Sequence, residues 1–126
     1  MSPVRVVLVE DNDTFRETLE LLLGMRDEVE VVASVGNGDD ASRVCAEMQP
    51  DVVLMDYRMP GLDGVQATAA VRQACPAVAV VCLTASANAA EMDALRDAGA
   101  FACLTKDQEL EEIVAVIKRA AGRLAA

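Results

Sequence analysis

The chain has 126 residues, of which 53% are hydrophobic and only 2% aromatic, so we expect one domain with a core of Val, Leu, Ala and Met. Its formal net charge of −10 argues against direct binding to nucleic acid, because the surface would repel phosphate groups. No apolar run approaches the roughly 20 residues of a membrane span, and the first residues have no signal-peptide organisation, so we expect a cytoplasmic protein with no membrane contact.

Short apolar runs predict five buried strands. They cover residues 4–9, 29–35, 52–55, 78–83 and 102–105. A short, β-branched, apolar run with a polar residue at its exit is typical of a parallel strand that is buried on both faces. Glu30 lies between apolar neighbours in the second run, which indicates a strand at the edge of the sheet.

Helical patterns follow each of these strands. The expected helices run from Asn12 or Asp13 to Gly24, from Asp39 or Asp40 to Pro50, from Asp63 to Ala74, from Asn88 to Ala98, and from Gln108 onward. Apolar stripes are expected at Phe15, Leu19, Leu22 and Leu23 in the first helix and at Leu110, Ile113, Val114 and Ile117 in the last. Strands and helices that alternate five times are the signature of a doubly wound sheet.

The connections between these elements predict the order of the strands. Right-handed crossovers with helices on both faces require strands to be added on both sides of the first strand. The fold class is therefore α/β: a flavodoxin-like doubly wound parallel sheet of five strands, order 2-1-3-4-5, with five helices. Strands one and three would then be neighbours about 4.8 Å apart.

Polar residues stand where four of the strands end. Glu10 and Asp11 follow the first strand, Asp56 the third, Thr84 the fourth and Lys106 the fifth. Ligands bind beyond the carboxyl ends of the strands in such sheets, so these side chains are expected at one edge. Three carboxylates, a hydroxyl and an ammonium together suit a hard divalent cation and a phosphoryl group.

The motifs around these residues point to a family. In chain order they are Leu8-Val9-Glu10-Asp11, the run LMDYRMPGLDG from Leu54 to Gly64, Leu83-Thr84-Ala85-Ser86, and Gly99-Ala100 followed by Lys106. Together they resemble the receiver domain of bacterial two-component response regulators, and the resemblance covers essentially the whole chain. It implies a receiver domain over residues 1–121 and a tail or the start of a linker over residues 122–126.

The resemblance implies a Mg²⁺ site. Asp11 matches the acid that binds the ion directly, and Glu10 the acid that usually acts through water. Asp56 and the backbone carbonyl of Arg58 match the other protein ligands.

It also implies a phosphoryl acceptor. Asp56 matches the aspartate that receives the phosphoryl group, Thr84 the hydroxyl that follows this group, and Lys106 the lysine that pairs with it. Such a domain is not an enzyme with turnover. It catalyses only its own phosphorylation and slow dephosphorylation.

The implied partner is a sensor histidine kinase, which donates the phosphoryl group from its own histidine. An effector or a second copy of the chain would bind the face formed by residues 88–121. Asp107 after Lys106 resembles the subgroup that often carries a carboxyl-terminal helix-turn-helix domain. The sequence does not decide between a stand-alone receiver and the amino-terminal half of a transcription factor.

One position departs from the family pattern. The family usually has an aromatic switch residue three positions before its lysine, and this chain has Cys103 there. Phe101, two residues earlier on the same strand face, is the candidate substitute. The four cysteines lack zinc-ligand spacing and the chain has no histidine. Cys82 and Cys103 fall inside predicted strands and are expected to be small core residues.

Three other functions compete with this interpretation. Residues 36–41 match a permissive G-x-G-x-x-A dinucleotide pattern, but Asp39 and Asp40 would stand where the pyrophosphate should bind. An aspartyl-phosphate phosphatase would have an acid two residues after its nucleophile, where this chain has Arg58. A pseudo-receiver that acts only as an interaction module is opposed by the intact acids, Thr84 and Lys106.

Overall fold

Five strands and five helices alternate along the chain in the computed structural model, which describes residues 2–59, 62–85 and 88–122. The strands are β1 (Val4–Val9), β2 (Val29–Val35), β3 (Val52–Asp56), β4 (Ala79–Thr84) and β5 (Ala102–Thr105). The helices are α1 (Asp13–Gly24), α2 (Ala41–Met48), α3 (Gly64–Ala74), α4 (Ala89–Asp97) and α5 (Leu110–Ala120). The motif residues Pro60, Gly61 and Ser86 and the tail beyond Gly122 lie outside the described residues.

The strands form one parallel sheet in the order β2-β1-β3-β4-β5, which confirms the predicted order. β1 lies between β2 and β3, the topological switch point lies between β1 and β3, and Val9 pairs with Met55. The residues that follow these two therefore leave the sheet side by side. β2 is an edge strand, as Glu30 predicts.

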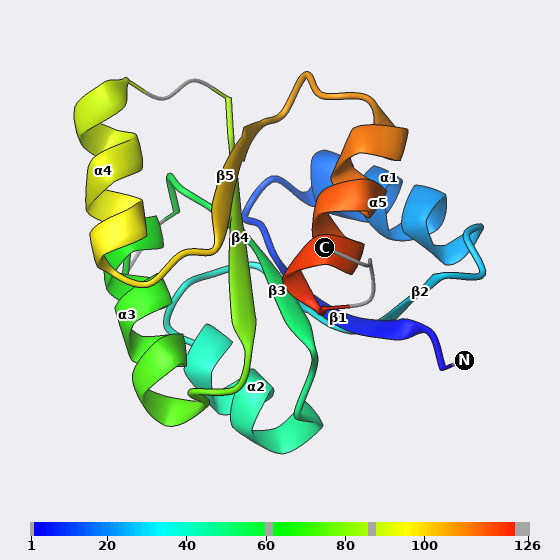
Figure 1. The fold of residues 1–126 in the computed structure, drawn as a ribbon, viewed down its shortest axis with the longest axis horizontal. Coiled ribbons are helices and arrows are strands. Elements are labelled where there is room, and N and C mark those ends of the chain that lie inside the picture. The colour runs from blue at the N-terminus through cyan, green and yellow to red at the C-terminus, as the bar shows by residue number, and fades with distance from the viewer. Residues whose placement is uncertain (1, 60–61, 86–87, 123–126) are drawn as a thin grey trace.

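Helices cover both faces of the sheet, with α1 and α5 on one face and α2, α3 and α4 on the other (Figure 1). The strands alternate their side chains between two apolar clusters. Val53 and Met55 face α2, α3 and α4, whereas Val52 and Leu54 face α1 and α5. Full burial of each such side chain contributes about 1.5–3 kcal/mol to the free energy of unfolding. The sheet is therefore a stable support for the residues at its edge. Among the described residues, no helix combines the length and apolarity needed to cross a membrane.

The helix starts follow specific polar contacts. Asn12 rather than Asp13 caps α1, since its side chain accepts a hydrogen bond of 2.9 Å from the Phe15 amide. Asp40 holds the cap position of α2 but makes no cap bond with its side chain. Instead, the Asn37 side chain accepts a 2.9 Å bond from the Asp40 amide.

One expectation about a helix face was wrong. Leu22 is 39% exposed, because Leu19 and Leu23, which are four residues apart, take the face of α1 that meets the sheet. The last helix begins at Leu110, two residues after the approximate start predicted at Gln108, because the Gln108 amide donates to the Thr105 carbonyl in a turn. The other helix bounds differ from the predicted ones by one or two residues.

The junction between β3 and α3 is tightly built. Asp63 and Gln66 form a capping box, in which each side chain accepts a hydrogen bond from the other residue's amide. The Gly64 amide donates a 2.7 Å hydrogen bond to the Tyr57 carbonyl. A β-carbon on Gly64 would lie 2.7 Å from the Tyr57 α-carbon. This close backbone approach leaves room only for a glycine at position 64.

Gly64→Ala should therefore destabilise the protein by about 1–3 kcal/mol, the usual cost of overpacking. Gly24→Ala is the matched control, because a β-carbon there meets nothing within 4 Å and alanine favours the helix by about 0.5–1 kcal/mol. Urea unfolding followed by circular dichroism measures both. Equal stability of the two variants would contradict the close approach at Gly64.

Candidate functional site

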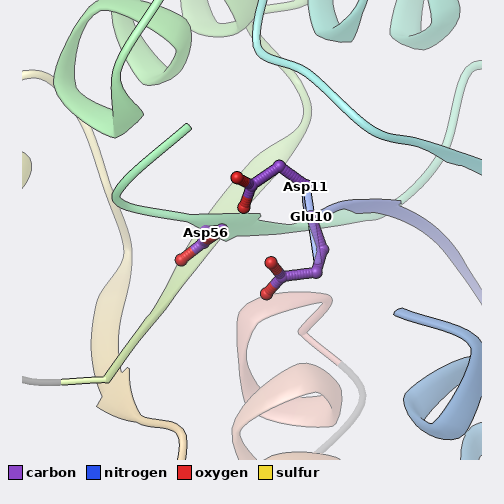
Figure 2. Close-up of side chains that lie close together, drawn as sticks. All are labelled: Glu10, Asp11 and Asp56. Atoms are coloured by element: carbon purple, nitrogen blue, oxygen red, sulfur yellow. The ribbon is translucent and has the colours of Figure 1, made fainter. Parts of the chain in front are cut away.

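Three carboxylates meet at the carboxyl edge of the sheet. Glu10 and Asp11 follow β1, and Asp56 ends β3, beside it. One oxygen from each lies within 4.8 Å of the other two, and Figure 2 shows the three groups turned toward a common space. Glu10 and Asp56 are only 4% and 6% exposed, whereas Asp11 is exposed.

Glu10 is held by several contacts. Its amide donates a 3.0 Å hydrogen bond to the Val35 carbonyl, which extends the pairing of β1 with β2. Its carboxylate accepts a 3.0 Å bond from the Asn12 amide. The Arg16 guanidinium donates a 2.7 Å bond to the Glu10 carbonyl and a 2.8 Å bond to the Asp13 carboxylate. The first turn of α1 thus fixes the backbone that carries the acids.

Lys106 supplies the positive charge. Its Nζ lies 2.6 Å from Glu10 Oε1 and 3.3 Å from Asp56 Oδ1. The Lys106 amide donates a 2.7 Å bond to the Thr84 carbonyl, which ties the exit of β5 to that of β4. The ammonium also lies 4.6 Å from the centre of the Phe15 ring, within the range of a cation–π contact.

The protonation of this cluster reflects burial and charge. Burial raises the pKa of Asp56 to about 7, with further upward contributions from Glu10 and Asp11, while Lys106 opposes the shift. Burial lowers the pKa of Lys106, but its contacts with Glu10 and Asp56 outweigh that effect, so the net shift is upward. Near neutral pH, Asp56 is therefore poised between its neutral and charged forms.

A cavity of about 420 Å³ opens over these groups, and Arg58, Thr84 and Ala85 complete its lining. Thr84 is 1% exposed. The Arg58 side chain lies over the Tyr57 ring and reaches within 3.7 Å of Glu91 on α4. Every side chain that the sequence predicted for the site is thus brought to one place.

The two candidate switch positions differ in burial. Cys103 is half-buried against the cluster beneath α3 and α4, so it is less fully a core residue than expected. Phe101 is 48% exposed. Cys82, by contrast, is completely buried, as expected.

Sequence reasoning missed two residues that support the site. The apolar periodicity of the sequence places Phe15 only in the stripe of its helix and indicates no role for Arg16. Both lie in the first turn of α1, four and five residues after Asp11, which puts their side chains within reach of the acid pair. That spacing is the signal that identifies such supporting residues.

Protein atoms occupy the space beside Gly36 and Gly38 in the glycine pattern of residues 36–41. A β-carbon on Gly38 would overlap the Leu62 carbonyl oxygen, and one on Gly36 would lie 3.2 Å from Arg16. The glycines therefore let this loop pack against its neighbours.

The donor set fits a hard divalent ion. Mg²⁺ prefers carboxylate, carbonyl and water oxygens, and it is commonly held by one or two carboxylates. Close carboxylates repel one another, and a second cation beside Lys106 would relieve that repulsion. The structure thus places an acid cluster, a hydroxyl and a lysine together at the carboxyl edge of a doubly wound sheet.

The chain belongs to the response regulator receiver domain family, whose sequence profile matches residues 6–118. It is 35% identical over 114 residues to the transcriptional regulatory protein LnrK of Bacillus subtilis (strain 168), covering 90% of this chain and 52% of LnrK. It is 34% identical over 116 residues to the response regulator GacA of Pseudomonas aeruginosa, covering 92% of this chain and 54% of GacA.

Solved structures agree with this assignment. The signal receiver domain of NarL from Mycobacterium tuberculosis superposes with a TM-score of 0.92 at 35% identity, covering 97% of this chain and 98% of that domain. A LuxR-family response regulator from Aurantimonas gives a TM-score of 0.89 at 33% identity, with 99% and 90% covered. The chain spans about half the length of the curated relatives that it matches.

The raised pKa of Asp56 predicts how stability depends on pH without metal. Its folded-state pKa of about 7 lies above the ordinary value of 3.8, so the stability that Asp56 contributes is present below about pH 4 and lost as pH rises through 7. Asp56→Asn should raise the melting temperature at pH 8 and flatten the decline between pH 4 and 7. Thermal unfolding in a chelator, with the exposed Asp97→Asn as control, measures this. An unchanged pH profile in Asp56→Asn would contradict the assignment.

Proposed function

We propose that this domain accepts a phosphoryl group on Asp56 from the phosphohistidine of a sensor kinase and signals through a protein-binding face. The observation that carries the proposal is the convergence of Glu10, Asp11 and Asp56 around one space, with Lys106 in contact with two of them. Response regulators work with sensor histidine kinases, and membership of that family supports the choice of donor.

In the proposed reaction, a carboxylate oxygen of Asp56 attacks the phosphorus of the donor. The P–O bond to Asp56 forms as the P–N bond breaks, and the imidazole of the donor takes up a proton. The transfer needs alignment and charge neutralisation more than acid–base catalysis. A charged Asp56 is the nucleophile, which its pKa near 7 permits at neutral pH.

Two side chains of the chain would act on the transferred group. The Lys106 ammonium already lies 3.3 Å from an Asp56 oxygen, so its flexible stem can turn to the phosphoryl oxygens with a small movement. The Thr84 hydroxyl lines the same cavity and would donate to one of them. Phe15 keeps the ammonium close while this exchange takes place.

Mg²⁺ would be held by Glu10, Asp11, Asp56 and the backbone carbonyl of Arg58, and when bound it would neutralise charge on the phosphoryl oxygens. Its donor set is the acid cluster described above. Asp11 is exposed and is the proposed direct ligand, whereas Glu10 is engaged by Lys106 and the Asn12 amide and is proposed to act through water.

The proposed output face consists of α4, β5 and α5, within residues 88–121. An effector or a second copy would bind there. The curated relatives are about twice as long as this chain. We therefore propose that the whole protein is a regulator with an effector domain outside residues 1–121. The domain itself is proposed to turn over no external substrate and to bind no nucleic acid. Its cytoplasmic location stays a prediction.

The first test is labelling with acetyl phosphate and Mg²⁺, followed by mass spectrometry of the intact protein. One phosphoryl group should be added, and Asp56→Asn should abolish the addition while Asp97→Asn leaves it intact. Undiminished labelling of Asp56→Asn would overturn the assignment. No labelling of the wild type by acetyl phosphate or a kinase would favour the pseudo-receiver, and turnover of a small phosphomonoester would favour the phosphatase.

The second test asks which acid, Asp11 or Glu10, binds Mg²⁺ directly and which binds it through water. Asp11→Ala should weaken Mg²⁺ binding more than Glu10→Ala does, because a direct ligand is lost in the first case and a water-mediated one in the second. Asp97→Ala is the control, since Asp97 is exposed on α4 and is not one of the three acids of the cluster. Titration followed by amide NMR signals of β1 and β3 gives the affinities. The reverse order would show that the two roles are exchanged.

A further inference from the structure

Two cysteines that play no part in the proposed phosphoryl transfer lie side by side in the sheet. β4 and β5 are neighbouring strands (Figure 1). Cys82 on β4 is paired in register with Cys103 on β5. Both side chains lie on the face covered by α3 and α4, where Cys82 is part of the buried apolar cluster and Cys103 packs against it. Paired residues of neighbouring strands have α-carbons about 4.8 Å apart, inside the 4.4–6.8 Å range in which disulfides form.

The two thiols differ in a way that suits sequential chemistry. Cys82 is completely buried, and the Thr68 hydroxyl lies 3.8 Å from its sulfur. Cys103 is half-buried, whereas the other three cysteines are all buried. An oxidant from solvent therefore meets Cys103 first, and the neighbouring sulfur is that of Cys82.

The electrostatic surroundings agree with this order. Interaction with the neighbouring Cys82 thiol lowers the pKa of Cys103 to about 7 despite burial, and the positive charge of Arg96 on α4 acts in the same direction. The same interaction, together with burial, raises the pKa of Cys82. Cys103 thus has thiolate character at neutral pH, and Cys82 keeps its proton.

We propose that Cys103 and Cys82 form a peroxide-sensitive thiol pair that closes into a disulfide between β4 and β5. The Cys103 sulfur attacks one oxygen of a hydroperoxide, the O–O bond breaks, and water or an alcohol leaves, so that Cys103 becomes a sulfenic acid. The Cys82 sulfur then attacks the Cys103 sulfur, the S–O bond breaks, and a second water leaves with the Cys82 proton. The two sulfurs supply the two electrons that reduce the peroxide.

Formation of this disulfide does not require phosphorylation of Asp56. In reducing compartments, disulfides are usually transient and act as sensors, which is the role proposed here.

The disulfide would lie close to the candidate site at the edge of the sheet. Thr84 lies two residues beyond Cys82 on β4, and Lys106 three beyond Cys103, with the Lys106 amide bonded to the Thr84 carbonyl. A covalent link between the strands would restrain both exits of the sheet.

The test treats the reduced 126-residue chain with hydrogen peroxide, blocks the remaining thiols with an alkylating reagent, and maps the peptides by mass spectrometry. We expect loss of two hydrogens, a peptide link between Cys82 and Cys103, and reversal by dithiothreitol. Cys45 and Cys75 should remain alkylatable after unfolding, because both are buried. In the native reduced protein, Cys103 should be alkylated at least ten times faster than any other cysteine.

Variants separate the two steps. Cys103→Ser should abolish the disulfide, whereas Cys82→Ala should stop the reaction at a Cys103 sulfenic acid that dimedone traps. Cys82→Ala avoids placing a second hydroxyl beside Thr68, and circular dichroism checks that it folds. Cys75→Ala is the matched control and should form the disulfide normally.

Several outcomes would overturn the proposal. They are a link between Cys45 and Cys75, a dimer joined through Cys103 on a non-reducing gel, and no disulfide at excess peroxide. Dimedone labelling of Cys103 that is as strong in the wild type as in Cys82→Ala would also overturn it, because Cys82 would then not resolve the sulfenic acid. Phosphorylation of Asp56 need not occur for any of these results.

Discussion

The contact of one ammonium with two buried carboxylates is the constraint around which the edge of the sheet is arranged. Glu10 and Asp56 are almost fully buried beside each other, and burial of charge is costly unless an opposite charge offsets it. Lys106 contacts both from the exit of β5, which lies two strands from β3 and three from β1. Its amide is bonded to the Thr84 carbonyl, and its ammonium lies against the Phe15 ring. Only a parallel sheet that puts β1, β3, β4 and β5 in spatial succession brings these groups to one edge.

The rest of the fold keeps that edge in place. One apolar cluster packs against each face of the sheet, so the carboxyl ends of the strands cannot shift independently of one another. The connecting segments are fixed by local polar contacts at the start of the helices, such as the cap of α1 by Asn12 and the capping box of α3. The side chains that line the site lie on short segments, and each segment is anchored by a strand at one end and a helix at the other. Such side chains are held in position but can still move when a charged group enters the site.

The fold and the meeting of the candidate site residues at one edge of the sheet could be predicted because they follow from regular patterns. Buried strands have uniform apolar runs, and a polar residue directly after such a run has only the sheet edge to occupy. What could not be predicted depends on side-chain reach across loops, which has no period. The Arg16 contact with the Glu10 carbonyl, the exposure of Leu22 and the partial exposure of Cys103 all arise from how helices settle on the sheet.

The order of the strands has a consequence for how the molecule folds. All three acids are contained in the first 56 residues, and β1, β2 and β3 are neighbours that can pair before the remaining chain is available. The cation that compensates them arrives with the last strand, about 50 positions later. During synthesis, when the amino-terminal part of a chain emerges first, the half-built sheet therefore holds its acids without Lys106. Protons, metal ions or solvent must screen this charge until β5 docks, so the final strand contributes electrostatic stability as well as apolar contact.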